Sequence, residues 1–319
     1  MTEFDLIKKY FATQTEHRPD VRLGIGDDAA IVTVPAGHEL VVTTDTLIAD
    51  VHFPALTPPY DIGYKALAVN LSDLAAMGAS PAWATLAITL AEANEAWIQA
   101  FCDGFFTLAN RYQVQLIGGD LTHGSLSMTV QAMGFIPPGQ ALLRSTAKPA
   151  DLIYVTGTLG DAGLALHHLK QQISLSTEAQ HAVLTRLNRP EPRLPQGEHL
   201  RGLAHAAIDI SDGLAADLGH ILEQSQVGAI VYVDQLPLSE AVKQSLPPEK
   251  AITLALTAGD DYELCFTVPP EKRALIEKKL SSIPCRYTCI GVITEQQGLD
   301  LRYQDEKKYH GPKLGYQHF

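Results

Sequence analysis

The sequence predicts a mixed α/β (α+β) protein built from two domains. Short β-branched runs alternate along the chain with segments whose apolar residues recur at helical spacing. The chain has 319 residues, about twice the length of a typical domain. Apolar residues make up 46% of the chain and charged residues 19%, which is typical of globular proteins and excludes intrinsic disorder.

The predicted elements of the first half alternate between strands and helices. The β-branched run 39–44 predicts a strand, followed by a loop that contains Asp45 and His52. Residues 61–77 carry apolar residues at helical spacing, and Gly78 ends this helix because glycine easily adopts the left-handed cap conformation. The later elements are a strand at 81–90, a helix at 92–111, and strands at 114–117 and 127–136.

The polar stretch 144–150 predicts the start of a second domain. We therefore assign residues 1–147 to the N-terminal domain and residues 148–319 to the C-terminal domain. The second domain opens with a strand at 151–156, followed by the glycine-rich stretch 157–163 and a helix. Its other predicted elements are strands at 206–210, 227–233, 253–257, 263–268 and 289–293, and helices at 213–225 and 272–280.

The charge balance excludes several classes of protein. The chain has 24 Lys and Arg against 36 Asp and Glu, which gives a net charge of −12. Nonspecific nucleic-acid binding needs a surplus of cations, so we expect no nucleic acid as a partner. The acidic N-terminus does not resemble a signal peptide, and no apolar run of about 18 residues predicts a membrane span. We expect a cytoplasmic protein with no membrane partner.

The cysteines indicate neither a disulfide scaffold nor a strong metal motif. There are only four of them, which is sparse for a chain held together by disulfides. Cys285 and Cys289 have the spacing C-x3-C, but neither a second pair nor a nearby histidine accompanies them. We interpret them as buried or idle thiols, with a zinc site as the alternative.

Carboxylates recur beside glycine, serine or threonine, just after the predicted strands. Glycine allows tight turns and aspartate is a poor strand former, so a single such aspartate is most simply a turn or N-cap residue. Several such aspartates are harder to explain as turn or N-cap residues alone, because carboxylates that lie close together need a cation to remain charged. The pattern includes Asp27, Asp28, Asp45, Asp73, Asp120, Asp209, Asp212, Asp260 and Asp261.

Oxygen ligands of this kind select Mg²⁺ or Ca²⁺ rather than zinc or iron. Mg²⁺ usually takes only one or two protein carboxylates, while water and substrate phosphates complete its coordination. The residues around Asp209 lack the spacing of an EF-hand, which disfavours a calcium loop. The aspartates therefore predict several Mg²⁺ ions that bind a polyphosphate and reverse the local negative charge.

Other phosphate-binding and nucleophile signatures are missing from the sequence. It contains no P-loop motif and no G-x-S-x-G nucleophile elbow. Residues 24–29 (GIGDDA) have no third glycine at the dinucleotide spacing and carry acids where a pyrophosphate would lie, so we expect no Rossmann site. A plain tight turn explains the stretch 157–163 as well as a phosphate loop does.

Several long motifs resemble the thiamine-monophosphate kinase family, and the resemblance runs essentially from end to end. The longest is 64–79 (YKALAVNLSDLAAMGA), which is far more specific than a lone glycine motif. The wider superfamily includes aminoimidazole ribonucleotide synthetase and selenophosphate synthetase. The other matching segments are 24–29, 44–47 (TDTL) with His52 and Phe53, 118–120 (GGD), 155–157 (VTG), 209–214 (DISDGL), 261–264 (DYEL) and 315–316 (GY).

The resemblance implies an aminoimidazole ribonucleotide synthetase-like fold whose N-terminal domain pairs strands across a homodimer. It also implies a phosphotransferase that converts thiamine monophosphate to thiamine diphosphate with ATP and several Mg²⁺ ions. The N-terminal domain would hold metal and ATP, and the C-terminal domain would add nucleotide and substrate contacts. The implied metal ligands are Asp28, Thr43, Thr44, Asp45, Asp73, Asp120, Asp209 and Asp212. The implied ATP contacts are Gly119, Asp120, Arg144 and Ser211, and the implied substrate contacts are His52, Asp260 and Tyr316.

Two positions depart from the family's pattern. Many relatives have glutamate where this chain has Asp260, so the shorter side chain would reach the substrate through water or a slight loop shift. Thr43 stands where some relatives have serine, and either hydroxyl is able to bind a metal. Phosphoryl transfer depends mainly on positioning and charge neutralisation, and the acceptor phosphate is already ionised near neutral pH. We therefore expect direct in-line transfer with no covalent nucleophile and no phosphoenzyme.

Two other functions remain open. Another ATP-using member of the superfamily would act on a different phosphate or amide. Its selenophosphate branch places a reactive cysteine near the N-terminus, whereas the first cysteine here is Cys102. A non-catalytic Mg²⁺–nucleotide sensor would use the same ligands, so only turnover distinguishes it. His52, Arg144 and Tyr316 also have plain structural interpretations, as a loop histidine, a surface ion-pair partner and a C-terminal packing residue.

Overall fold

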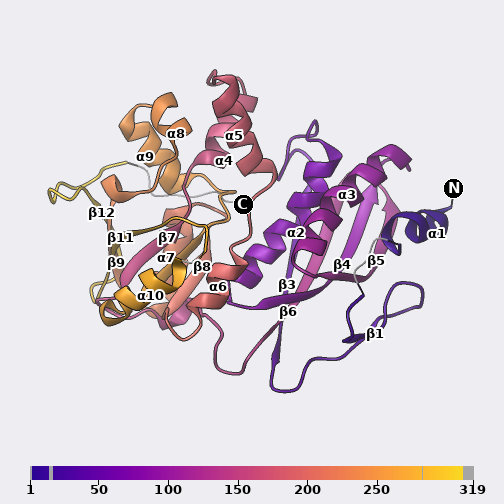
Figure 1. Cartoon of the computed structure of the whole chain (residues 1–319). Coiled ribbons are helices and arrows are strands. Elements are labelled where there is room, and N and C mark those ends of the chain that lie inside the picture. The colour runs from indigo at the N-terminus through magenta and orange to yellow at the C-terminus, as the bar shows by residue number, and fades with distance from the viewer. Residues whose placement is uncertain (1, 14–16, 282, 312–319) are drawn as a thin grey trace. The chain divides into compact units, whose positions relative to one another are not determined.

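The computed structural model describes residues 2–13, 17–281 and 283–311. The chain divides into two compact units: one comprises residues 1–74 and 79–139, and the other comprises residues 75–78 and 140–319. Each unit contains one main β-sheet with helices packed against it (Figure 1). Within the described residues, no helix combines the length and the apolar character needed to cross a membrane.

The first unit contains a four-stranded sheet in the order β3-β6-β4-β5. β6 lies antiparallel to both β3 and β4, whereas β4 and β5 are parallel. The sheet is therefore mixed, and β3 and β5 form its two edges. The strands are β3 (Glu39–Ile48), β4 (Ser80–Leu90), β5 (Gln115–His123) and β6 (Ser127–Ile136).

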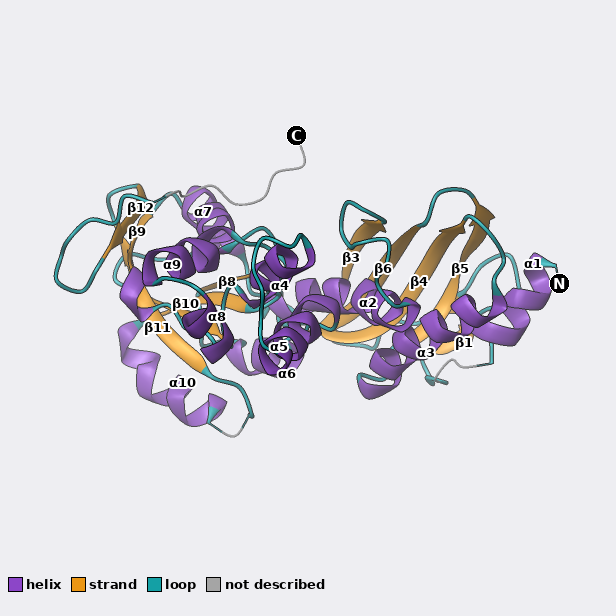
Figure 2. Ribbon diagram, turned by 90° about the horizontal axis from the view of Figure 1, so that it is seen from above, coloured by secondary structure: helices purple, strands orange, loops and turns teal. Residues whose placement is uncertain are grey.

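Two long helices, α2 (Pro59–Ala76) and α3 (Glu95–Arg111), cover one face of this sheet (Figure 2). They approach closely because glycine lies at their contact: a Cβ on Gly104 would lie only 1.8 Å from the carbonyl oxygen of Tyr60. Asn94 begins α3 by accepting a hydrogen bond from the N–H of Trp97. The smaller elements are α1 (Glu3–Leu6), a π-helical turn (Ile7–Phe11), β1 (Val21–Leu23) and β2 (Ile31–Val32).

The other face of the sheet is covered only in part. Val21 and Val32 of the β1–β2 pair pack on a cluster that includes Trp83 and Phe135. Beyond that cluster, alternate residues of β3 leave apolar side chains exposed. Leu40 is 44% exposed, Val42 49% and Ile48 40%. The open face is therefore apolar along the β3 edge.

The second unit contains a six-stranded sheet in the order β12-β9-β11-β7-β10-β8, in which only the β12–β9 pair is parallel. Apolar residues of its strands form one core with α7, including Ile153, Ile208 and Cys265. The strands are β7 (Leu152–Thr156), β8 (Ala206–Asp209), β9 (Gly228–Tyr232), β10 (Leu264–Val268), β11 (Tyr287–Thr294) and β12 (Gly298–Arg302). The helices are α4 (Asp161–Leu169), α5 (Thr177–Asn188), α6 (Leu194–Leu200), α7 (Leu214–Ser225), α8 (Glu240–Ser245), α9 (Pro248–Thr257) and α10 (Arg273–Leu280).

The predicted mixed α/β class is confirmed, but one predicted strand is wrong. Residues 253–257 are the last turns of helix α9 rather than a strand. Pro247 and Pro248 begin this helix, and Ala251, Ile252, Ala255 and Leu256 bury its apolar side. A run of five residues does not distinguish a buried strand from a buried helical turn. Helices α1, α5, α6 and α8 and strands β1, β2 and β12 were not predicted.

Two strands are longer than the sequence predicts, which changes the setting of two aspartates. β3 pairs with β6 from Glu39 through Ile48, so Asp45 lies within the strand rather than in the loop after it. β5 pairs with β4 through His123, so Asp120 also lies within a strand. Aspartate is a poor strand former, but continuous pairing with a neighbouring strand overrides that local preference.

Candidate functional site

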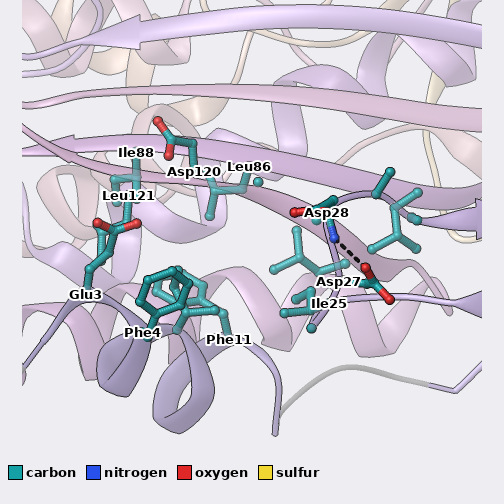
Figure 3. Close-up of a pocket in the computed structure, with 18 residues that line it drawn as sticks. Glu3, Phe4, Phe11, Ile25, Asp27, Asp28, Leu86, Ile88, Asp120 and Leu121 are labelled. Carbon is teal, nitrogen blue, oxygen red and sulfur yellow. Dashed lines mark hydrogen bonds between the residues drawn. The ribbon is translucent and has the colours of Figure 1, made fainter.

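A cavity of about 490 Å³ lies in the first unit between the N-terminal helical segment, the loop around residue 27 and β5. Figure 3 shows that Phe4 and Phe11 line it from the helical segment, while Asp120 comes from the strand. Asp27 and Asp28 enter from the loop, where the Asp28 N–H donates to Oδ1 of Asp27 at 2.9 Å. The cavity thus has acidic groups around a partly apolar lining, as expected for a site that binds a nucleotide through cations.

Gly119, just before Asp120, lets β5 lie tightly against β4. A Cβ on Gly119 would lie 1.9 Å from the carbonyl oxygen of Leu86, so no larger residue fits without moving the backbone. Gly118 and Gly119 also line the cavity together with Asp120. The GGD motif is thereby explained as a close approach of two strands that leaves the carboxylate exposed at the cavity.

A second acidic group lies at the opposite edge of the sheet. Asp45 of β3 and Asp73 of α2 interact directly, and the Thr43 hydroxyl donates a hydrogen bond to Asp73 Oδ2. Asn70, one turn before Asp73 on α2, accepts from the N–H of Asp45 at 3.1 Å. Burial and the negative charge of Asp73 raise the pKa of Asp45 to about 7. The pair is therefore unfavourable when both carboxylates are ionised and no cation is bound.

These residues fit the chemistry of Mg²⁺. Two carboxylates and one hydroxyl agree with the small number of protein ligands that Mg²⁺ usually takes. Burial and the neighbouring Asp73 carboxylate raise the pKa of Asp45, and a cation bound at this pair would oppose both effects. In the part of the chain that the structure describes, no group of three or more His, Cys, Asp and Glu side chains is close enough to hold a metal.

The predicted metal ligands of the first unit do not form one cluster. Strand alternation puts Thr44 on the opposite face of β3 from Thr43 and Asp45. Asp120 lies on β5, which β6 and β4 separate from β3. Three strand spacings amount to roughly 14 Å. Thr43, Asp45 and Asp73 therefore form one group, and Asp28 and Asp120 line a separate cavity.

His52 lies in the loop after β3 and is half-buried. Its Nδ1 accepts a hydrogen bond from the N–H of Ile48 at 3.0 Å. The neutral ring therefore carries its proton on Nε2, which makes that nitrogen a donor. Lys65 of α2 is only 2% exposed, and its Nζ donates to the carbonyl oxygen of His52 at 3.4 Å.

Four candidate residues of the second unit lie on two hydrogen-bonded loops, which we name the DISDG loop (residues 209–213) and the GDDY loop (residues 259–262). The N–H groups of Asp260 and Tyr262 donate to the carbonyl oxygens of Ser211 and Ile210, each at 2.8 Å. These contacts bring Asp209, Ser211, Asp212 and Asp260 into one region. The resemblance implied metal binding for Asp209 and Asp212, an ATP contact for Ser211 and a substrate contact for Asp260.

The GDDY loop has a strained backbone. Asp260 has φ of 67° and Tyr262 has φ of 48°, both in the left-handed region that non-glycine residues rarely adopt. Asp261 between them is buried, and its Oδ2 accepts from the N–H of Gly160 at 2.8 Å. Burial raises the pKa of Asp261 well above its usual range. This carboxyl therefore anchors the loop and is not exposed to a substrate.

Another buried carboxylate explains two of the sequence motifs as structural. Glu263 is fully buried and accepts hydrogen bonds from the guanidinium groups of Arg193 and Arg186 and from the Thr156 hydroxyl. Burial alone would raise its pKa, but these partners, Arg193 foremost, lower the pKa of Glu263. A Cβ on Gly157 would lie 1.9 Å from Glu263 Oε1. The VTG and DYEL motifs thus meet at a buried ion pair.

Arg144 and Tyr316 are not placed beside the DISDG loop by the described residues. Arg144 is exposed, and its carbonyl oxygen accepts from Ser225 Oγ at 2.8 Å. Ser225 ends the 12-residue helix α7. The C-terminal end of α7, where Ser225 contacts Arg144, is roughly 16 Å from the DISDG loop, given the usual rise per residue of a helix. Tyr316 lies outside the described residues.

Asp217 contacts the DISDG loop and was not singled out from the sequence. It is 3% exposed and lies in the first turns of α7, next to the DISDG loop. Burial raises its pKa to about 7, although N–H groups of that loop act in the opposite direction. The sequence did contain a signal for it. Asp217 lies four residues after Gly213, where the predicted helix begins, and on the side of that helix that the apolar pattern predicts to be buried.

Comparison with known proteins identifies the family. Residues 26–136 match the family described as AIR synthase related protein, N-terminal domain, and residues 148–304 match the corresponding C-terminal domain. The thiamine-monophosphate kinase of Escherichia coli K12 is 49% identical over 99% of this chain and 98% of its own length.

Solved structures agree in both fold and sequence. The crystal structure of thiamine-monophosphate kinase from Stenotrophomonas maltophilia K279a has a TM-score of 0.89 and 48% identity, covering 97% of this chain and 98% of that chain. A structure of AaThiL complexed with AMPPCP and TMP has a TM-score of 0.78 and 31% identity, covering 92% of each chain. The chain therefore belongs to the thiamine-monophosphate kinase family of the AIR synthase-like superfamily, and it is a kinase.

Proposed function

We propose that this protein transfers the γ-phosphoryl group of ATP to thiamine monophosphate, forming thiamine diphosphate and ADP. The observation that carries the proposal is the Asp45–Asp73 pair with the Thr43 hydroxyl, a cation site of the kind that binds polyphosphates. A relative that is 31% identical over 92% of this chain is described as complexed with AMPPCP and TMP, an ATP analogue and the acceptor.

The acidic residues of both units hold Mg²⁺ in this proposal. Thr43, Asp45 and Asp73 form the group with the clearest electrostatic need for a cation. When bound, Mg²⁺ neutralises charge on the phosphate oxygens and so reduces repulsion between the donor and acceptor phosphates. Thr44 faces away from this group, so it would contribute through its carbonyl oxygen. The remaining proposed ligands are Asp28, Asp120, Asp209 and Asp212.

Gly119, Asp120, Arg144 and Ser211 contact ATP in this proposal. The exposed Arg144 guanidinium suits a phosphate because its planar donors match two oxygens at once. The acceptor phosphate is largely ionised near neutral pH, its second pKa being about 6. Transfer is therefore direct and in line, and no side chain is needed as a nucleophile or a general base.

His52, Asp260 and Tyr316 hold thiamine monophosphate. The Nε2–H of His52 is a donor suited to the substrate's phosphate, since Nδ1 is already bonded to the backbone. The Asp260 carboxylate suits the positive charge of the thiazolium ring. The backbone hydrogen bond from Asp260 to Ser211 ties this substrate contact to the nucleotide contacts of the DISDG loop.

The active protein is a homodimer in this proposal. Leu40, Val42 and Ile48 leave an apolar surface along the β3 edge, which a second copy would bury. The separation of Asp45 from Asp120 within one chain gives further support. If two sheets pair across the interface, the β5 edge of one copy would bring Asp120 toward the Asp45 group of the other.

Turnover with matched variants tests the proposed function. Wild-type protein with ATP, Mg²⁺ and thiamine monophosphate should form thiamine diphosphate and ADP. Asp45→Asn and Asp120→Asn should each lower kcat/KM at least about 100-fold, or about 2.7 kcal/mol of transition-state stabilisation. Asp103→Asn, at an exposed position on α3, should leave activity unchanged.

The same experiment separates the alternatives. A nucleotide sensor would bind AMPPCP but form no product with any acceptor. Another superfamily member would consume ATP only with a different phosphate or amide. A phosphorylated aspartate or histidine that forms and decays at the rate of turnover would contradict direct transfer.

A further inference from the structure

We propose that Asp217 is a positioning residue that holds the DISDG loop in the geometry needed for nucleotide binding; this inference rests on the proposed function. Asp217 does not belong to any predicted ligand set, and it is 3% exposed, so it does not itself meet the nucleotide. Its contacts are with the backbone of the residues that do.

The Asp217 carboxylate binds two consecutive backbone N–H groups of the loop. Its Oδ2 accepts from the N–H of Asp212 at 3.0 Å and from the N–H of Gly213 at 3.1 Å. Both donors come before the first residue of α7, Leu214. The side chain therefore reaches back from the helix and fixes the loop, rather than satisfying donors within the helix itself.

The GDDY loop also holds the DISDG loop. A Cβ on Gly259 would lie 2.2 Å from the carbonyl oxygen of Ser211, so the two backbones touch at a position where only glycine fits. The carbonyl oxygen of Ser211 also accepts from the N–H of Asp260 at 2.8 Å. The segment of Ser211 and Asp212 is thus clamped between Asp217 and the GDDY loop.

Gly213 makes the conformation of the DISDG loop depend strongly on the Asp217 carboxylate. Its φ of 114° lies in the region that favours glycine, so its backbone has more freedom than any other residue would have. Without the Asp217 carboxylate, two N–H groups beside this flexible residue would lose their acceptor. The loop would then sample conformations in which Ser211 and Asp212 no longer face the nucleotide together, which weakens binding.

Three variants and one control test the role of Asp217. Asp217→Ala removes the acceptor, and Asp217→Leu removes it while filling a similar volume, in case the alanine variant does not fold. Asp217→Asn keeps one oxygen that is able to accept both N–H groups. Asp151→Ala is the control, because Asp151 is a buried carboxylate of the same unit. Asp151 lies just before the first residue of β7, whereas Thr156, the partner of Glu263, is the last residue of that strand.

Two measurements on folded protein decide the proposal. Amide hydrogen exchange of ligand-free protein at residues 211–213 should quicken at least tenfold in Asp217→Ala or Asp217→Leu. The Kd for AMPPCP with Mg²⁺ should rise at least tenfold in the same variants. Asp217→Asn should remain within about threefold of wild type in both measurements. Asp151→Ala should lower the melting temperature without changing either.

Three results would overturn the proposal. The first is unchanged hydrogen exchange in both Asp217→Ala and Asp217→Leu, and the second is faster exchange in these variants with an unchanged Kd for AMPPCP. The third is a change in Kd of the same size in the Asp151→Ala control. The second of these would make Asp217 a structural cap alone. Binding of AMPPCP does not require turnover, so the inference survives if wild type binds it but fails to phosphorylate thiamine monophosphate. That last outcome would reject the proposed function instead.

Discussion

Replacing Asp45 with Asn should stabilise the metal-free protein, and Mg²⁺ should reduce that gain because it stabilises wild type more than the variant. Burial and Asp73 raise the pKa of Asp45 from 3.8 to about 7. An acidic group whose pKa is raised on folding does not lower the free energy of unfolding at pH values below its unfolded pKa. Its unfavourable contribution grows as the pH rises from that value toward the folded pKa. Metal-free wild type should therefore lose stability between about pH 4 and pH 7, and the Asn variant should lack this loss.

The size of the effect follows from the pKa shift. A rise of the pKa from 3.8 to about 7 corresponds to at most about 4 kcal/mol, because solvent screens the partly exposed Asp45 carboxylate. In EDTA at pH 8 the variant should be more stable than wild type by up to that amount. Mg²⁺ at about 100 times its Kd should stabilise wild type by about 2.7 kcal/mol, and Asp45→Asn by much less.

Thermal unfolding from pH 4 to pH 8, with EDTA or with Mg²⁺, measures both effects. Asp103→Asn is the matched control, since this exposed acid on α3 should follow the wild-type curve in each condition. Identical pH profiles of wild type and Asp45→Asn in EDTA would refute the electrostatic reasoning. Equal stabilisation of both proteins by Mg²⁺ would refute the assignment of the metal to this pair.

Three further predictions concern packing and assembly. Gly119→Ala should destabilise the protein by about 3 kcal/mol or more in chemical denaturation, because its Cβ would strike the β4 backbone, and it should weaken AMPPCP binding in calorimetry. Glu263→Gln should cost about 3–5 kcal/mol of stability by leaving its arginine partners without a buried anion, yet KM for both substrates should not change. Val42→Asp should place a charge on the open sheet face, so sedimentation should show dimer for wild type and monomer for the variant.

The sequence predicted the class of fold well because strong periodic segments dominate it. The helix expected at 61–77 is α2 (Pro59–Ala76), and Gly78 follows it with φ of 71°. The strand expected at 127–136 has those bounds in the structure. The short apolar run 253–257 was assigned wrongly, since helix and strand periods cannot be separated over five residues and the packing of the whole of α9 decides between them.

The sequence predicted the residue types of the candidate site but not how these residues are arranged in space. A neighbouring threonine singled out Asp45 and a neighbouring glycine singled out Asp120, but neither pattern showed that pairing with β6 and β4 carries both residues into strands. The strand predicted at 39–44 already put Thr43 and Thr44 on opposite faces by alternation, but it ended before Asp45, so the linear pattern did not show that Asp45 shares the face of Thr43. Asp217 carries no motif of its own, and only the folded loop shows which backbone groups it binds.

Product formation from purified protein tests the central claim most directly. Protein incubated with ATP carrying a labelled γ-phosphate, Mg²⁺ and thiamine monophosphate should convert the acceptor to labelled thiamine diphosphate, with one ADP formed for each product molecule. Thiamine and AMP, offered separately as acceptors, should remain unlabelled. Release of labelled inorganic phosphate without thiamine diphosphate, or equal labelling of another acceptor, would contradict the account.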